Sequence, residues 1–434
     1  MTQVVSQSQR HWPIRTVGEL ATAIQYGYTA KSNRAISGPK YLRITDIQDD
    51  TVDWPQVPSC EIDKEDIAKY RLKAGDLVFA RTGATVGKSY LIRLGVPLSV
   101  FASYLIRIRF GPEVDSRYVS YFFSSPSYWR QVTERQAGIG QPNVNGKKLA
   151  QVKLPVAPIE EQQNVIAEIE KQFSRLDDAV TNLKRIKANL KRYKAAVLNA
   201  AVEGRLVPTE SEPVRHGKGN RSATAGDLPK GWVWSTLGEL GKVIGGLTKN
   251  PKRSLLPRKL PYLRVANVYA NELRLSEIEE IGVADGELEK LLVKKGDLLI
   301  VEGNGSPDQI GRVALWDGSI EPCVHQNHLI KVRLDEMLPH WALIWLLSPG
   351  GRREIERVTS STSGLHTLSS GKVSRLPVPV PSLAEQHRIV AEVERRVSFI
   401  AQVEAQTDAD LQRAARLRQS ILQTSFASDA IPAQ

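Results

Sequence analysis

The chain has 434 residues, 41% of them hydrophobic and 24% charged, with a formal net charge of +12 and a sequence pI near 9.5. This composition is typical of a soluble globular protein of about two to four domains, and the positive charge favours nucleic acid over a membrane as the partner. Two cysteines, no apolar signal core and no apolar run beyond Trp341 to Leu347 exclude a disulfide framework and a membrane span, so we expect a cytoplasmic protein.

The first 158 residues predict a mixed α/β globule. "DLVFA" (76–80) and "YLIRIRF" (104–110) have the β-branched alternation of strands. "SRYVSYFFSS" (116–125) predicts a short helix that ends near a Ser-Pro pair.

A long helix is predicted for residues 159–203, after Pro158. Its apolar residues follow a three-four spacing, which predicts one seam for a partner helix: Ile166, Ile169, Phe173, Leu176, Val180, Leu183, Leu190 and Val197. Residues 204–229 are polar and rich in Pro, Gly and Ser, and we interpret them as a flexible linker.

The same plan then returns at a period of roughly 220 residues. "YLRITDI" (41–47) returns as "YLRVANV" (262–268), "KAGDLVF" (73–79) as "KKGDLLI" (294–300), and "YLIRIRF" as "HLIKVRL" (328–334). A second globule is therefore predicted for residues 230–381 and a second long helix for residues 382–427, which "SLAE" (382–385) opens with a capping box. The seam of this helix contains Val390, Val393, Val397, Ile400, Leu411 and Ile421.

The charges on the two helices predict their relative direction. Acidic residues come early in each helix and basic residues late: Glu160, Glu161, Glu168 and Glu170 precede Lys184, Arg185, Lys191 and Arg192, and Glu385, Glu392 and Glu394 precede Arg413, Arg416 and Arg418. Antiparallel packing places acid against base at both ends. We therefore predict an α+β chain with two homologous domains separated by an antiparallel coiled coil, with pseudo-twofold symmetry.

"RTGATVGKSY" (81–90) ends like a nucleotide-binding P-loop, but three residues rather than four separate Gly83 from Gly87. The second copy has "VEGNGSPDQIGRVAL" (301–315) there, which is longer and lacks the Lys-Ser. A variable turn between two strands explains both versions better than a phosphate loop does. A P-loop nucleotide-binding enzyme stays as an alternative that a nucleotide titration would test.

Other catalytic motifs are absent from the sequence: there is no GxGxxG with a following acid, no HExxH and no GxSxG. His325 and His328 form an HxxH, but the first copy has Phe101 and Tyr104 at these positions, so we expect no metal site.

The whole layout resembles the specificity subunit of type I restriction–modification systems. The motifs that carry the resemblance are "IEEQQNVIAEIE" with "LAEQHRIVAEVE", "LNAAVEGRL" with "ILQTSFASDAI", the two "GDL" strands, and "LPKGWVWSTLGEL". The resemblance implies a non-catalytic subunit that reads a split double-stranded DNA target through two target-recognition domains, with the helices as spacer and subunit-binding surface. It also implies two modification (methyltransferase) subunits and two restriction (translocase and nuclease) subunits as partners, with S-adenosylmethionine, ATP and Mg²⁺ bound by them and no cofactor in this chain.

Loops between strands are the candidates for reading DNA, because base and phosphate contacts need Arg, Lys, Asn, Gln, Ser, Thr or His. In the first copy the candidates are Arg81, Thr82, Thr85, Lys88, Gln141, Asn143, Asn145, Lys147, Lys31 and Arg34. In the second copy they are Asn304, Gln309, Arg312, His366, Thr367, Ser369, Lys372, Lys249, Lys252 and Arg253. An orphan two-domain DNA-binding module, or a subunit that serves a combined methyltransferase–nuclease, is the further alternative.

Overall fold

A computed structural model describes residues 12–48, 50–82, 86–134, 144–209, 228–304, 309–362 and 365–427. The chain divides into two compact units: unit 1 contains residues 1–184 and 408–434, and unit 2 contains residues 185–407. Each unit thus combines one predicted globule with parts of both long helices, α6 (Ile159–Val202) and α11 (Leu383–Ser425).

Unit 1 is built around a four-stranded antiparallel sheet with the order β2-β11-β8-β9. Its strands are β2 (Ala21–Tyr26), β11 (Leu105–Phe110), β8 (Leu77–Ala80) and β9 (Ser89–Leu91). A second sheet has the order β10-β4-β7-β3, with β10 (Ser99–Phe101), β4 (Lys40–Leu42), β7 (Ser59–Cys60) and β3 (Ser32–Asn33). Two short ladders join β1 (Ile14–Thr16) to β12 (Lys153–Pro155) and β5 (Ile47–Gln48) to β6 (Thr51–Val52).

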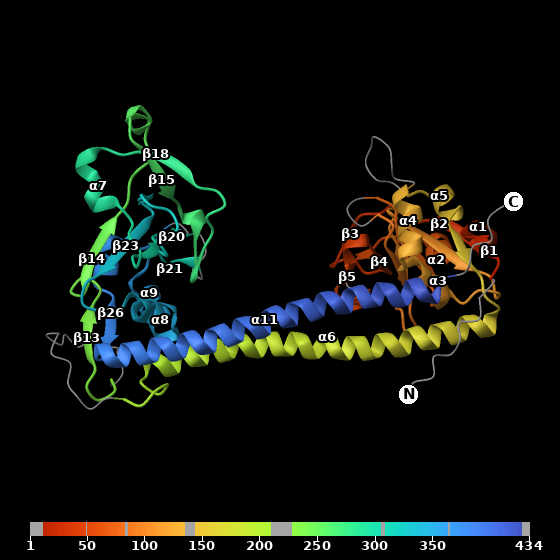
Figure 1. Ribbon diagram of the computed structural model, residues 1–434. Helices are drawn as coiled ribbons and strands as arrows, with labels where there is room; N and C mark the ends of the chain where they lie inside the picture. The colour runs from red at the N-terminus through yellow and green to blue at the C-terminus, as the bar shows by residue number, and fades with distance from the viewer. Residues whose placement is uncertain are drawn as a thin grey trace. The chain divides into compact units, whose positions relative to one another are not determined.

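Unit 2 (Figure 1) repeats the strand order of the main sheet. Its main sheet has the order β14-β23-β19-β21, with β14 (Gly241–Gly245), β23 (Leu329–Leu334), β19 (Leu298–Val301) and β21 (Val313–Leu315). The other ladders contain β18 (Glu279–Gly282), β15 (Lys259–Leu263) and β22 (Val324–His325); β13 (Val233–Thr236) and β26 (Pro377–Val380); β16 (Val268–Tyr269) and β17 (Glu272–Leu273); and β20 (Gly303–Asn304), β25 (Leu365–Thr367) and β24 (Ser360–Thr362). The last of these, the three-stranded sheet β20-β25-β24, is without a counterpart among the described residues of unit 1. The parallel pairing of β10 with β4 returns as that of β22 with β15, so the predicted internal repeat is also a repeat of the fold.

Short helices cover the sheets in each unit. Unit 1 has α1 (Val17–Leu20), α2 (Lys64–Tyr70), α3 (Ser116–Phe123), α4 (Pro126–Glu134) and α5 (Gly146–Ala150). Unit 2 has α7 (Asp285–Leu291), α8 (Pro339–Leu347), α9 (Pro349–Val358) and α10 (Ser370–Ser374). The helix predicted near 116–125 is confirmed as α3.

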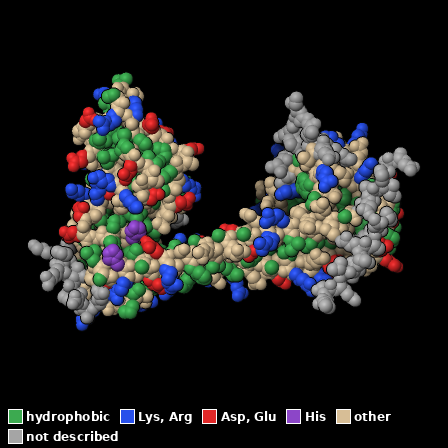
Figure 2. All heavy atoms as spheres, viewed as in Figure 1, with side chains coloured by type: hydrophobic (Ala, Val, Ile, Leu, Met, Phe, Trp, Pro, Cys, Tyr) green, Lys and Arg blue, Asp and Glu red, His purple; other side chains and the backbone are tan. Residues whose placement is uncertain are grey.

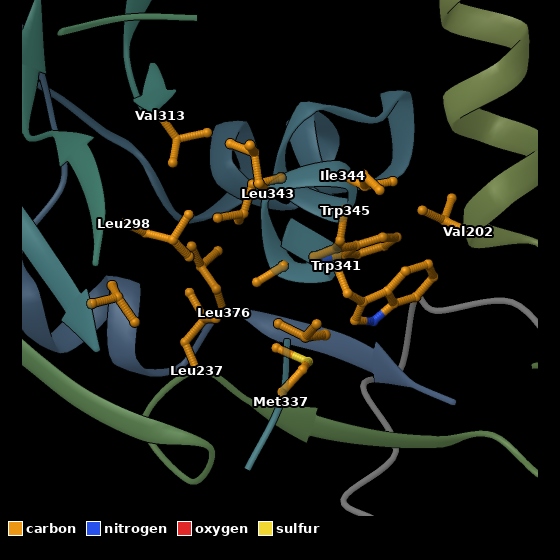
Figure 3. Close-up of a cluster of buried hydrophobic side chains, with 14 of the residues drawn as sticks. Val202, Leu237, Leu298, Val313, Met337, Trp341, Leu343, Ile344, Trp345 and Leu376 are labelled. Atoms are coloured by element: carbon orange, nitrogen blue, oxygen red, sulfur yellow. The ribbon is translucent and has the colours of Figure 1, made fainter. Parts of the chain in front are cut away.

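The core of each unit joins its main sheet to the long helices. In unit 1, Ile166, Ile169 and Phe173 of α6 and Leu422 of α11 belong to the same apolar cluster as α3. In unit 2, α8 is buried on nearly all sides, and its indoles share a cluster with Val202 at the end of α6 (Figure 3). Each domain therefore packs on the first half of its own helix and on the end of the other.

The long helices run antiparallel, as the charge pattern predicts. In unit 1 the Arg418 guanidinium lies 2.6 Å from the Asp177 carboxylate and 4.0 Å from the centre of the Phe173 ring. In unit 2 Arg388, early in α11, donates to the Pro208 carbonyl, six residues beyond the end of α6, at 3.1 Å. The Ser382 hydroxyl accepts from the Glu385 N–H at 3.1 Å, which is one half of the predicted capping box.

The predicted seam residues differ in their burial. Seven of them are buried, namely Ile166, Ile169, Phe173, Val197, Val390, Val393 and Ile400. The others are half-buried, namely Leu176, Val180, Leu183, Leu190, Val397, Leu411 and Ile421. A three-four spacing identifies the stripe, but much of its most buried part faces a domain as well as a helix.

Candidate nucleic-acid interface

Residues 81–88 connect two antiparallel strands, β8 and β9, which form a hairpin. Phe79 of β8 pairs with Ser89 of β9. The Gly87 N–H donates to the Ala80 carbonyl at 3.0 Å, and the Ala80 N–H donates to the Lys88 carbonyl at 2.9 Å. Gly87 has a φ of +85°, a conformation that side-chain-bearing residues rarely adopt.

This geometry overturns the P-loop alternative. A P-loop requires its Gly-Lys-Ser to open a helix, because the helix N-terminus and the loop N–H groups hold the phosphates. Here Ser89 begins strand β9, and Gly87 lies at the end of the connection between β8 and β9. Gly311 holds the matching place in the second copy: it has a φ of +62°, and its N–H donates to the Val301 carbonyl at 3.1 Å.

Two further segments of unit 1 meet this hairpin. The Arg81 N–H donates to the Tyr104 carbonyl, and the Val144 N–H donates to the Arg81 carbonyl, each at 3.1 Å. The Arg81 guanidinium stacks on the Tyr26 ring, 5.0 Å from its centre, and the Tyr26 hydroxyl accepts from the Gly146 N–H at 2.8 Å. The hairpin, the turn between β10 and β11 and the segment before α5 therefore form one surface, which we call the first loop surface.

Unit 2 brings the equivalent segments together. The Glu302 N–H donates to the His328 carbonyl at 2.9 Å, and the Leu368 N–H donates to the Glu302 carbonyl at 2.7 Å. The Glu302 carboxylate also lies 3.1 Å from Nδ1 of His328. Strand β20 pairs Gly303 with Thr367. We call this convergence the second loop surface.

Some predicted residues have structural roles in or near these surfaces. Asn145 caps α5 by accepting the Lys148 N–H at 2.9 Å, and Ser369 caps α10 by accepting the Lys372 N–H at 3.3 Å. The Arg312 guanidinium lies 4.7 Å from the centre of the Tyr269 ring and 3.4 Å from the Gln309 amide oxygen.

The matching basic clusters near the start of each domain differ in their ion pairs. Arg253 pairs with Glu287 at 3.0 Å, and this hydrogen bonding raises the pKa of Arg253. Lys249 pairs with Glu279 at 2.7 Å. The charge of these two residues is therefore partly satisfied within the protein, whereas Lys31, Arg34 and Lys252 are exposed.

The remaining candidates have these positions. Lys88 and Lys147 are exposed and Thr82 is half-buried. Asn304, His366 and Thr367 lie on the paired strands β20 and β25. Thr85, Gln141 and Asn143 lie outside the described residues.

The structure adds Tyr104 and His328 to the candidate DNA-contacting residues. Neither is among the candidates predicted from the sequence. Tyr104 is 63% exposed, and both residues directly precede a central strand, β11 or β23, next to the hairpin of their own domain. The signal was available in the repeat, because a large ring at the turn before "LIRIRF" and "LIKVRL" faces solvent in both copies. An exposed ring beside an arginine is suited to stacking or edge contacts with bases.

The HxxH pair does not form the beginning of a metal site. His325 is fully buried whereas His328 is exposed. Among the residues that the structure describes, no three His, Cys, Asp or Glu side chains lie together as a metal ligand set would. Within the same described part of the chain, no helix has the length and apolar character to cross a membrane.

Charge alone does not single out an interface. Figure 2 shows Lys and Arg side chains interspersed with Asp and Glu on the visible face of both units. The loop surfaces are therefore defined by the convergence of their segments.

Comparisons with known proteins agree with this architecture. The family model described as "Type I restriction modification DNA specificity domain" matches residues 9–192 and again residues 229–412. The chain is 28% identical over 432 residues to the EcoKI type I restriction enzyme specificity subunit of Escherichia coli K12, covering 96% of this chain and 88% of that protein. It is 26% identical over 431 residues to the StySPI specificity subunit of Salmonella potsdam, with the same coverage of 96% and 88%.

Two solved structures share the fold. A chain from a study of complex assembly and conformational transition of the type I R-M system aligns with a TM-score of 0.73 at 18% identity, covering 97% of this chain and 98% of that one. The HsdS subunit from Thermoanaerobacter tengcongensis aligns with a TM-score of 0.58 at 19% identity, covering 99% and 100%. With two matches of the family model that together span most of its length, this chain belongs to the type I restriction–modification DNA specificity family.

Proposed function

We propose that this chain is the specificity subunit of a type I restriction–modification enzyme, in which each domain reads one half of a split DNA target. The observation that carries the proposal is the pair of loop surfaces, which have the same frame and different sequences. Because the hairpin after β8 and the longer segment after β19 present different side chains, the two halves of the target differ and the whole target is asymmetric.

Each loop surface is suited to groove contacts. Side chains that reach base edges come from loops on a rigid frame, while lysines and arginines nearby hold the phosphates. Arg81 with Tyr104 in the first domain, and Asn304 with His328 in the second, are the residues that we assign to reading. Lys88, Lys147, Lys31 and Lys252 are assigned to phosphate contact.

The chemistry is assigned to partner proteins. The chain itself has no catalytic role and binds no cofactor in this proposal. Two methyltransferase subunits bind S-adenosylmethionine and modify adenine in each half-site, and two restriction subunits use ATP and Mg²⁺.

The decisive test is to co-express the chain with its cognate methyltransferase subunit and to map methylated adenines genome-wide. We expect one split, asymmetric motif. Exchange of residues 81–88 for another sequence is expected to change one half of that motif and leave the other half intact. DNA binding without any new methylation would instead favour the orphan-module alternative, and methylation of a motif without two halves would refute the proposal.

We further propose that the helix pair sets the number of unread base pairs between the half-sites. A helix rises about 1.5 Å per residue, so four residues inserted after Ala179 and four after Val403 add about 6 Å. The preferred spacer should then become longer. As a control, four residues inserted after Gly217, in the linker, should leave the spacer unchanged, and an unchanged spacer in the helix variant would exclude this ruler role.

A further inference from the structure

One buried glutamine occupies the first turn of each long helix. Gln162 is 0% exposed and Gln386 is 1% exposed, whereas the next residues, Gln163 and His387, are both exposed. The two glutamines hold the same place in the repeated "IEEQ" and "LAEQ" motifs. Burial of an amide is unfavourable unless its oxygen and nitrogen are hydrogen-bonded, so its partners indicate what it does.

In unit 1 the Gln162 amide joins three pieces of backbone. Its oxygen accepts the N–H of Asp115, the N-cap residue of α3, at 2.9 Å. Its nitrogen donates to the carbonyl of Glu113 at 3.0 Å and to that of Ala157 at 2.7 Å. One side chain thus ties the start of α6 to the loop that leads into α3.

Unit 2 repeats this arrangement with a different sequence around it. The Gln386 oxygen accepts the N–H of Leu338, the N-cap residue of α8, at 2.9 Å. Its nitrogen donates to the Pro381 carbonyl at 3.0 Å. In both domains the glutamine binds the N-cap residue of the helix that packs on the long helix.

The other contacts between these helices are less directional or lie at the surface, as does the hydrogen bond from the Tyr121 hydroxyl of α3 to the Glu170 carboxylate of α6 at 3.4 Å. Apolar packing depends mainly on buried area and permits small rotations. The ion pairs at the edge, Arg117 with Glu170 at 3.7 Å and His340 with Glu394 at 3.9 Å, are long and exposed and hold little energy. Hydrogen bonds weaken steeply with distance and angle, so a buried amide can fix the angle between a domain and its helix. In the first domain the Trp12 indole N–H also donates to the Glu161 carboxylate of α6 at 2.8 Å, but the buried glutamine amide is a directional contact that both domains share.

We propose that Gln162 and Gln386 are positioning residues that fix the angle of each recognition domain on its long helix, and thereby restrict the complex to one spacing between its half-sites. This inference rests on the proposed function. Loss of either amide should leave the loop surfaces intact and should broaden only the range of spacer lengths that the complex accepts.

The test uses the complex of the full chain with its methyltransferase partner. Gln162→Met and Gln386→Met keep the side-chain length and remove the hydrogen bonds, and Gln163→Met and His387→Met are the exposed controls. Each complex methylates a plasmid library in which the two half-sites are separated by spacers of different length, and long-read sequencing gives the methylated fraction. We expect unchanged half-sites and about a tenfold rise of off-length relative to correct-length methylation, equivalent to about 1.4 kcal/mol of lost discrimination. The controls should match the wild type.

A second variant tests the same bond from its donor side. Leu338 has a φ of −64°, which suits proline, so Leu338→Pro removes the N–H that Gln386 accepts. It should broaden the spacer range towards that of Gln386→Met, and the double variant should be no broader than Gln386→Met alone, because that change already removes the bond to Leu338.

A spacer profile equal to that of the wild type, or an equal loss of methylation at every length, would overturn the inference. A wild-type complex that methylates no split motif would instead refute the proposed function.

Discussion

The two domains build the same main sheet and stabilise it with different buried cations. In the first domain Arg107 of β11 is buried and donates to the carbonyl of Arg71, at the end of α2, at 2.8 Å. In the second domain Lys331 of β23 is buried and donates to the carbonyl of Leu292, at the end of α7, at 2.7 Å. The carbonyl end of a helix favours a cation. Both domains therefore have a positive charge at this helix end, although the residue type differs.

The position that Phe101 occupies in the first domain differs more strongly between the two domains. The Arg107 guanidinium lies 5.1 Å from the centre of the Phe101 ring. The residue at the place of Phe101 is His325, whose two ring nitrogens have no hydrogen-bond partner among the described residues. Burial and the nearby Lys331 charge lower the pKa of His325 to about 3, so the imidazole is neutral at physiological pH and acts as an apolar ring. The residues at these buried positions therefore keep their shape and charge in both domains, whereas the residues of the loop surfaces can differ between the domains.

The largest effect should come from removing the carboxylate beside the buried cations. Asp76 lies 2.6 Å from Arg109 and 3.8 Å from Arg107. Asp76→Ala leaves these charges without their partner and should lower the free energy of unfolding of the first domain by about 3–5 kcal/mol. Urea unfolding followed by tryptophan fluorescence measures the change, with the exposed Glu113→Ala as control. A loss below about 1 kcal/mol would contradict the assigned role.

The second domain should tolerate the matching change better at high pH. Asp297 lies 2.6 Å from Arg333, and burial lowers the pKa of Lys331 to about 8. Above that pH Lys331 can release its proton, whereas arginine stays charged. The effect of Asp297→Ala should therefore decrease between pH 7 and pH 9, while that of Asp76→Ala stays constant.

The next effect concerns DNA. Arg81→Ala should weaken binding of the complex to its target by about 1–3 kcal/mol, and only through the half-site that the first domain reads. Arg312→Ala should affect only the other half-site, and less. Both guanidinium groups lie over a tyrosine ring, but that of Arg312 also lies 3.4 Å from the Gln309 amide oxygen and 3.5 Å from the Val265 carbonyl. Competition binding with duplexes altered in one half, at constant salt, measures both. Equal sensitivity of both halves to one variant would refute the separation of the two readers.

The strands and helices of both domains can be predicted well from the sequence because they occur twice in the chain. Strands such as β8 and β19 are apolar runs bounded by turn residues, and two copies with the same order of blocks confirm each other. The site is harder to predict because its contacts join residues far apart in the chain. The bond of Gln162 to Asp115 spans 47 residues, and the ion pair of Arg253 with Glu287 spans 34. Neither periodicity nor composition reports such contacts.

His325 allows a smaller test of the comparison. His325→Phe installs the ring of the first domain and removes two unpaired buried nitrogens, so it should stabilise the second domain by about 1 kcal/mol. The pH dependence gives a second readout. Because the pKa of His325 is lowered from 6.5 to about 3, the unfolded chain binds a proton between these values that the folded domain does not.

Stability of the wild-type second domain should therefore fall as the pH decreases from 6.5 to 3, and His325→Phe should lack that part of the slope. Unfolding measured at several pH values tests this. A variant that is less stable than the wild type, or that has the same slope, would show that His325 is paired in the protein.

The smallest effect is expected where the two units differ on the helix surface. Asp177 and Arg418 pair in unit 1, but the equivalent residues in unit 2 are Ala401 and Lys194. Asp177→Asn should cost less than about 1 kcal/mol, because exposed ion pairs are weak and screened by salt. Ala401→Asp should place a carboxylate near Lys194 and gain a similar small amount at low salt. Both differences should vanish in 1 M NaCl, where the Debye length is about 3 Å, and a gain that persists there would mean that Ala401→Asp acts through something other than charge.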